Sequence, residues 1–199
     1  MDEAVVPTRE RIIQAAIACF ARSGFHGASM QQICAEAHVS PGALYRHFPG
    51  KDTIIAAIAQ AERTRHAAFF DSMASADDPV EALVGVGLGS LEAMLAGDIN
   101  VLSVEITAEA IRNPDIRENF MCNAREAREI MVAAMRRGQD RGLVDPVLDI
   151  EAACDLMMAM GDGLIAHQAL NPGMSPTRFR PVLETMVRRL FRPPSPVRP

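Results

Sequence analysis

Residues 29–51 spell two short helices joined by a tight turn, and this pattern constrains the fold more than any other part of the chain. Ser29 can cap the first helix, and Gln32 stands three residues later, where its side chain completes a capping box. Ser40 is a good N-cap for the second helix, and Pro41 at the first helical position loses no amide that would otherwise be bonded. The stretch therefore predicts a helix–turn–helix.

The second of these helices has two distinct faces. Leu44 and Phe48 are four residues apart and point inward together. The other face has small residues at its tip and hydrogen-bond donors behind them, namely Gly42, Ala43, Tyr45, Arg46 and His47. A helix of this kind is shaped to enter a groove of double-stranded DNA.

The motif resembles the helix–turn–helix of the tetracycline-repressor (TetR) family of bacterial one-component regulators. The matching run is residues 39–51, Val-Ser-Pro-Gly-Ala-Leu-Tyr-Arg-His-Phe-Pro-Gly-Lys. His38 stands where the family usually has glycine, at a turn position that often needs a positive φ. Histidine enters that region at a cost on the order of 1 kcal/mol, so we expect the turn to be kept.

The resemblance implies a homodimer that binds a palindromic operator. It assigns phosphate contacts to Ser29, Tyr45, His47 and Lys51. It assigns base contacts to Gln31, Pro41, Gly42, Ala43 and Arg46. Arg46 could donate two hydrogen bonds to a guanine, and Ala43 could contact a thymine methyl group. For Tyr45 an alternative stays open, in which the ring only packs between helices.

The apolar spacing along the rest of the chain predicts an all-α protein of about nine helices. We expect a three-helix DNA-binding head at residues 1–50, a ligand-binding and dimerisation body at 51–192, and a disordered tail at 193–199. The resemblance places the dimer interface in the last two long helices, within residues 149–192.

One segment of the predicted body, residues 80–97, contains three closely spaced glycines, at positions 85, 87 and 89. A phosphate-binding loop is one alternative, but the segment lacks the Lys-Ser/Thr ending and a preceding strand. The favoured alternatives are close helix packing at the glycines and a weakly stable, soft helix. The second follows because each glycine destabilises a helix by ~1 kcal/mol relative to alanine.

The predicted body holds all but two of the twelve methionines, which adapt to irregular apolar shapes. Together with the resemblance, this predicts a repressor that a small apolar or amphipathic effector releases from its operator. The family's pocket lies among the middle helices, and the candidates are Leu102, Glu105, Ile106, Glu109, Phe120, Asn123, Met131 and His167. Methionine as ordinary core filling is the alternative. Glu105 and Glu109 share a face, where they would meet a cation or only water.

The net charge of −5 does not exclude DNA, because attraction depends on where the positive groups lie. Residues 1–51 carry five basic and four acidic side chains, so the acidic excess falls in the remainder. Lys51 is the only lysine of the chain. We find neither a signal peptide nor an apolar run long enough to cross a bilayer, and we therefore expect a cytoplasmic protein with no membrane partner.

The four cysteines are scattered without CxxC pairs, which favours buried thiols over disulfides or zinc ligands. Cys34 and His38 are four residues apart, but no third ligand accompanies them, so we predict no metal site. The chain has no nucleophile-elbow, Walker or metalloprotease pattern, and we predict neither catalysis nor a cofactor. The competing hypothesis is a small-molecule carrier or enzyme that retains a vestigial DNA-binding head.

Overall fold

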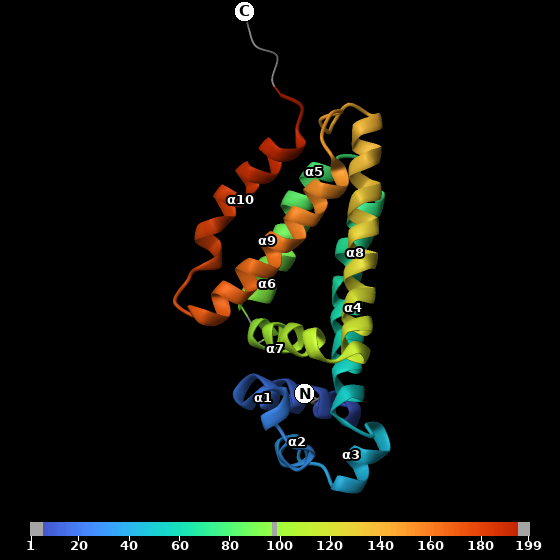
Figure 1. Cartoon of the computed structure of the whole chain (residues 1–199), viewed down its shortest axis with the longest axis vertical. Helices are drawn as coiled ribbons and strands as arrows, with labels where there is room; N and C mark the ends of the chain where they lie inside the picture. The colour runs from blue at the N-terminus through green and yellow to red at the C-terminus, as the bar shows by residue number, and fades with distance from the viewer. Residues whose placement is uncertain (1–5, 97–98, 195–199) are drawn as a thin grey trace, which may run out of the picture. The chain divides into compact units, whose positions relative to one another are not determined.

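The computed structural model describes residues 6–96 and 99–194, which form helices and no strand (Figure 1). This confirms the all-α prediction. The helices are α1 (Thr8–Gly27), α2 (Met30–Ala37), α3 (Pro41–His47), α4 (Lys51–Ser75), α5 (Pro79–Ala82), η1 (Leu83–Gly87), α6 (Leu88–Ala96), α7 (Ile99–Arg112), α8 (Pro114–Asp140), α9 (Ile150–Leu170) and α10 (Pro176–Phe191). Most of the tail predicted to be disordered lies outside the described residues.

The glycine-containing segment differs most from the sequence prediction, because one predicted helix is divided into α5, η1 and α6. η1 is a π-helical turn, in which the Leu88 N–H donates to the carbonyl of Leu83. A Cβ atom added at Gly85 or Gly89 would meet nothing within 4 Å. Close packing therefore does not explain these two glycines, and the segment fits the soft-helix alternative.

The chain divides into two compact units. Unit 1 comprises Met1–Thr64 and Asp98–Cys122, and unit 2 comprises Arg65–Gly97 and Asn123–Pro199. None of the described helices is long and apolar enough to cross a membrane.

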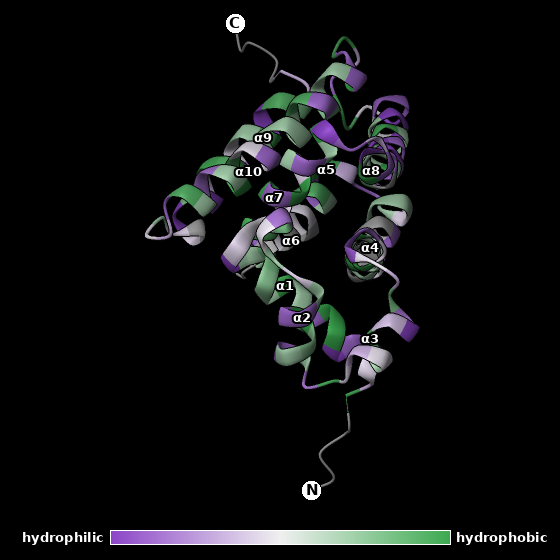
Figure 2. Ribbon diagram, turned by 60° about the horizontal axis from the view of Figure 1, so that its bottom comes forward, coloured by the Kyte–Doolittle hydropathy of each residue, from purple (hydrophilic) through white to green (hydrophobic). Residues whose placement is uncertain are grey.

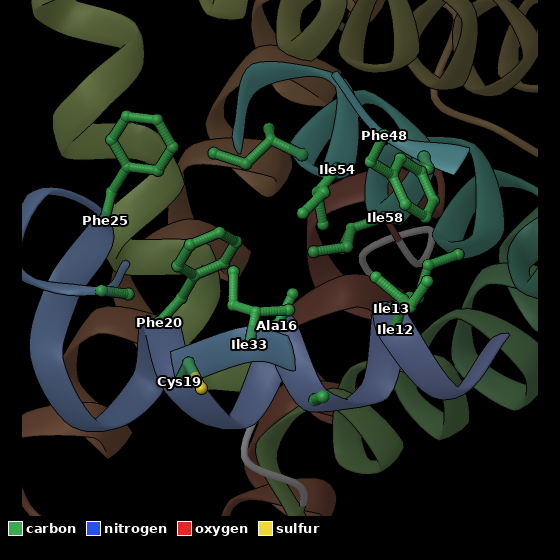
Figure 3. Close-up of a cluster of buried hydrophobic side chains, with 14 of the residues drawn as sticks. Ile12, Ile13, Ala16, Cys19, Phe20, Phe25, Ile33, Phe48, Ile54 and Ile58 are labelled. Atoms are coloured by element: carbon green, nitrogen blue, oxygen red, sulfur yellow. The ribbon is translucent and has the colours of Figure 1, made fainter. Parts of the chain in front are cut away.

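Unit 1 has a continuous apolar core to which the first three helices, α4 and α7 all contribute (Figure 3). Its most deeply buried side chains include Ile12, Ile13, Phe20, Ile33, Leu44, Ile54, Ile58 and Leu102. Three short helices of about fifty residues bury too little apolar surface for a stable fold of their own. In the structure, α4 and α7 supply the missing surface.

Unit 2 has its own apolar core, built around Met73, Val80, Ala134, Met135, Val144, Cys154, Val187 and Phe191. Hydrophilic and hydrophobic residues alternate along α8 and α10, as expected of helices that bury one face (Figure 2). On α10, Leu183, Val187 and Phe191 recur every four residues and are buried.

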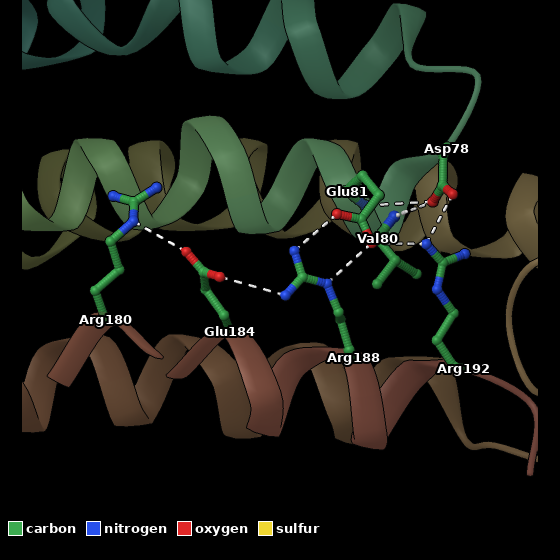
Figure 4. Close-up of polar contacts among 7 residues, drawn as sticks. All are labelled: Asp78, Val80, Glu81, Arg180, Glu184, Arg188 and Arg192. Carbon is green, nitrogen blue, oxygen red and sulfur yellow. Dashed lines mark hydrogen bonds and ion pairs between the residues drawn. The ribbon is translucent and has the colours of Figure 1, made fainter. Parts of the chain in front are cut away.

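A row of ion pairs fastens α10 to α5 and lies at the edge of this core (Figure 4). Two nitrogens of the Arg188 guanidinium contact the two carboxylate oxygens of Glu81, at 3.1 and 3.0 Å. Arg192 binds Asp78 at 2.7 Å and Glu81 at 2.9 Å. The hydrogen bonds from Arg188 and Arg192 lower the pKa of Glu81 to about 2.

The end of α8 folds back on itself in a Schellman motif. Gly142 has a φ of 71°, and the Leu143 N–H donates to the carbonyl of Gly138 at 2.9 Å. The reversal brings Val144 against Gly138, and Pro79 of α5 also packs there. An added Cβ would lie 2.6 Å from Val144 Cγ2 and 2.8 Å from Pro79 Cγ. Gly138 is thus required by space.

We predict that Gly138→Ala lowers the free energy of unfolding by about 1–3 kcal/mol, because the new methyl group overpacks the core of unit 2. Gly89→Ala is the matched control, since its Cβ enters open space and alanine favours a helix by up to ~1 kcal/mol. Urea unfolding followed by circular dichroism measures both variants. Equal stability of Gly138→Ala and wild type would contradict the prediction.

Candidate nucleic-acid interface

The helix–turn–helix begins with the capping contacts that its sequence predicts. Ser29 Oγ accepts from the Gln32 N–H at 3.2 Å, and Gln32 Oε1 accepts from the Ser29 N–H at 2.7 Å. Ser40 Oγ accepts from the Ala43 N–H at 3.2 Å. Both helices of the motif therefore start at fixed residues.

The turn between α2 and α3 adopts the left-handed conformation at His38, with φ 52° and ψ 48°. The prediction that histidine keeps this turn is confirmed. The Arg11 guanidinium of α1 donates to the carbonyls of Ala37 and His38, at 2.6 and 2.9 Å. We did not expect this contact, because the partners lie 26 and 27 residues apart and no local pattern pairs them.

Helix α3 buries one face and leaves the other to solvent. Leu44 is fully buried and Phe48 is 3% exposed, whereas Tyr45 is 52% exposed. The alternative in which Tyr45 only packs between helices does not fit this exposure. Exposed with it are the predicted contact residues Ser29, Gln31, Pro41, Gly42, Arg46 and His47, and Ala43 is half-buried. The geometry leaves the predicted DNA-facing side of α3 accessible.

The Lys51 side chain is half-buried and its ammonium group contacts the end of α1. Its Nζ donates to the carbonyls of Phe25 and Ala28, at 2.6 and 3.0 Å, and lies 4.6 Å from the centroid of the Phe25 ring. The ammonium group thus stabilises the last turn of α1, which follows a kink at Gly24. The sequence resemblance assigns it only a phosphate contact, and that assignment stays a prediction.

The eight predicted effector-binding residues fall into both units. Leu102 is buried in the core of unit 1, and Ile106 and Phe120 pack against that core. Glu105 and Glu109 accept hydrogen bonds from residues at the end of α1. In unit 2, Met131 is buried in the core, Asn123 is half-buried and His167 is exposed. Their role as an effector site stays a prediction.

A surface hollow of about 440 Å³ lies on α1 and α2 and is lined by Cys19, Arg22, Ser23, Gln32, Ala35, Glu36 and His38. None of the predicted effector residues lines it. Within the described residues, no three His, Cys, Asp or Glu side chains are grouped so that they could hold a metal ion.

Three of the four cysteines, Cys19, Cys34 and Cys154, are buried as predicted. Burial raises the pKa of the Cys154 thiol to about 12 and also raises that of Cys19. Both thiols are therefore protonated and poorly nucleophilic near neutral pH. Cys122 is exposed, and here the prediction of burial is wrong.

Comparison with known families and proteins agrees with this geometry. Residues 12–58 match the family model of bacterial regulatory proteins of the tetR family, and residues 91–192 match the C-terminal model of BetI-type transcriptional repressors. The transcriptional regulator UidR of Escherichia coli K12 is 33% identical over 170 residues, which cover 83% of this chain and 84% of the relative.

Solved structures extend the similarity to the whole fold. GusR of Salmonella enterica has a TM-score of 0.76 at 33% identity, and the match covers 95% of this chain and 97% of that chain. The regulator FadR from Bacillus subtilis, solved with stearoyl-CoA, has a TM-score of 0.79 at 16% identity over 89% of this chain and 96% of that chain, which shows the fold alone. The chain belongs to the tetR family of bacterial regulatory proteins and is a DNA-binding transcriptional regulator.

Proposed function

We propose that the protein is a homodimeric repressor that binds a palindromic operator and leaves it when a small apolar or amphipathic effector binds. The observation that carries the proposal is that α3 has one buried and one exposed face. Leu44 anchors the helix in the core, while Tyr45, Arg46 and His47 are exposed. Such a helix can lie in the major groove without unfolding any part of the core. Acting on an operator would place the protein in the cytoplasm.

Within this proposal the residues of the motif have two roles. Arg46 and Gln31 read base edges, with Pro41, Gly42 and Ala43 allowing close approach of the backbone to the groove. Tyr45, His47, Ser29 and Lys51 hold phosphates, which position the protein but do not read sequence. The exposure of the α3 tip supports the first role.

The last two helices have the surface that a dimer interface needs. Along α9, an exposed stripe of apolar and small residues recurs at helical spacing and comprises Ala152, Leu156, Ala159, Gly163 and Leu170. On α10, Val182 and Met186 are 58% and 48% exposed. We propose that a second copy of the chain covers these faces, and its two-fold symmetry then matches a palindromic operator.

The effector is proposed to be apolar or amphipathic because four of its candidate residues, Leu102, Ile106, Phe120 and Met131, are apolar. FadR of similar fold was solved with stearoyl-CoA, a molecule of this chemical type. An effector that contacts Glu105 or Glu109 would have to displace their hydrogen bonds to α1. A change from 99:1 to 1:99 in DNA-competent protein requires about 5.5 kcal/mol of differential effector binding.

We predict that Arg46→Ala weakens binding to operator DNA by about 1–3 kcal/mol at fixed salt, with little change in thermal stability, because the side chain is exposed. The measurement is fluorescence anisotropy on the intergenic DNA next to the gene, with excess competitor DNA. Arg141→Ala, which removes an exposed arginine of unit 2, is the control for net charge. Equal losses in both variants would rule out base reading by Arg46.

We predict that Leu156→Glu converts the dimer to a monomer, because a charge enters the apolar interface, and that it abolishes operator binding at nanomolar protein. Light scattering after size-exclusion chromatography gives the mass. Ile111→Glu introduces the same charge at a side chain that is 72% exposed on α7, outside residues 149–192, and should leave the mass unchanged. A dimeric Leu156→Glu protein would exclude Leu156 from the interface.

We predict that Lys51→Met has two separable effects. Loss of the contacts to Phe25 and Ala28 lowers the free energy of unfolding by about 1–3 kcal/mol, because the carbonyls lose a charged donor. Loss of a phosphate contact reduces the slope of log affinity against log salt by ~1 for each subunit. Thermal melts and a salt titration of operator binding measure the two effects, and an unchanged slope would leave Lys51 only its role in the turn.

A further inference from the structure

Helix α1 is kinked at Gly24, and its last turn, residues 24–28, leads directly into the helix–turn–helix. This turn begins at Gly24, whose φ is 69°, and the Ala28 N–H donates to the carbonyl of Gly24 at 3.1 Å. Phe25 and Ala28 are buried, and Ser29 follows directly as the N-cap of α2. The position of this turn therefore sets where the first helix of the motif begins.

Side chains from two distant helices hold the same peptide groups of this turn. Glu105 Oε2 of α7 accepts from the Phe25 N–H at 3.3 Å. Lys51 Nζ of α4 donates to the Phe25 carbonyl at 2.6 Å. The N–H and C=O of one residue are thus each bound by a charged side chain, one negative and one positive. Hydrogen bonds to charged groups are stronger than those between neutral groups.

One helical turn further along α7, Glu109 makes a second contact with the turn. Its Oε2 lies 2.8 Å from His26 Nε2 and 3.4 Å from a guanidinium nitrogen of Arg112. The side chain of Glu109 is only 6% exposed. A buried carboxylate that loses a hydrogen-bond donor is strongly disfavoured, so Glu109 resists any separation of α7 from His26.

The Glu105 carboxylate also lies close to the kink. A Cβ atom at Gly24 would lie 3.0 Å from Glu105 Oε2, so any larger residue at this position would displace the carboxylate. Leu102 and Ala110 of α7 belong to the same apolar core as Phe20 and Phe25 of α1. Displacement of α7 would therefore move the turn with it or break both carboxylate contacts.

These contacts join the two segments that the family models distinguish. The turn lies within residues 12–58, the DNA-binding segment, and α7 lies within residues 91–192, the C-terminal segment. α7 is followed after one residue by α8, which continues from unit 1 into unit 2. A rearrangement around α7 and α8 thus has a direct mechanical route to the start of α2.

We propose that Glu105 and Glu109 are positioning residues that lock residues 24–28 to α7, and that this lock is needed for tight binding to the operator. The inference rests on the proposed repressor function. It assigns to the two carboxylates a role within the chain, in place of the effector contacts that the sequence suggests. In the closed lock, α2 and α3 are held in the arrangement that fits the operator.

A double-mutant cycle of Glu109→Gln and His26→Ala tests the lock. Each variant should weaken operator binding about tenfold at fixed salt, since each removes one charge-assisted contact. The double variant should be no weaker than the weaker single variant, because Glu109→Gln already removes the charged partner of His26. Glu109→Gln also removes a negative charge, which by electrostatics alone would strengthen DNA binding. A loss of affinity in this variant therefore cannot be caused by the change in net charge.

Glu10→Gln is the matched control, because it removes one negative charge from the same unit, where Glu10 accepts a hydrogen bond from Gln14 on α1 outside the motif. It should not weaken operator binding. Hydrogen exchange gives a readout that needs no DNA: the Phe25 amide should exchange faster in Glu105→Gln and Glu109→Gln than in wild type or Glu10→Gln. If Glu109→Gln does not fold, Glu105→Gln serves as the second variant, because its amide oxygen can still accept from the Phe25 N–H, more weakly than the carboxylate.

The outcomes separate this proposal from the one on which it rests. Wild-type protein that binds no fragment would refute the repressor function, while the exchange rate of Phe25 would still show whether the carboxylates hold the turn. Wild-type protein that binds its operator, with folded variants of unchanged affinity or with additive losses in the cycle, would overturn the lock.

Discussion

The buried face of α1 is the constraint on which unit 1 depends. Ile12, Ala16 and Phe20 are fully buried, and they pack in one core with side chains of α2, α3, α4 and α7. A three-helix head alone would expose much of this surface to water. Because α7 completes the core, the DNA-binding helices are stabilised by a helix that lies far along the chain, and their stability depends on where that helix is.

Polar contacts fix the relative position of the helices that this apolar packing brings together. Burial of side chains in the core holds α1 and α7 together but tolerates small sliding movements, since the hydrophobic effect is non-directional. The pairing of Glu105 with the Phe25 N–H, and of Glu109 with His26, fixes the register of the two helices. Lys51 fixes the other side of the same turn. A regulator that must place two recognition helices on one operator needs such registration.

Much of the helix–turn–helix was predictable because its determinants are local. The caps at Ser29 and Ser40 and the left-handed turn at His38 each depend on residues within a few positions of one another. The inward direction of Leu44 and Phe48 follows from helical spacing. The structure of the glycine-containing segment was harder to predict. Glycine is a weak helix former, so such a segment can adopt α-helical, π-helical or irregular structure, and packing decides among them.

The sequence by itself determined where the helices of the motif begin and end and which residues of α3 face outward, because hydrogen bonds within one helical turn and the 3.6-residue period depend only on neighbouring residues. Only the tertiary structure decided that Lys51 binds the last turn of α1, that Arg11 holds the turn after α2, and that Glu109 meets His26 from 83 residues away. Charged side chains on different helices meet only where helix crossings bring them together, and the crossings are set by the packing of the whole core.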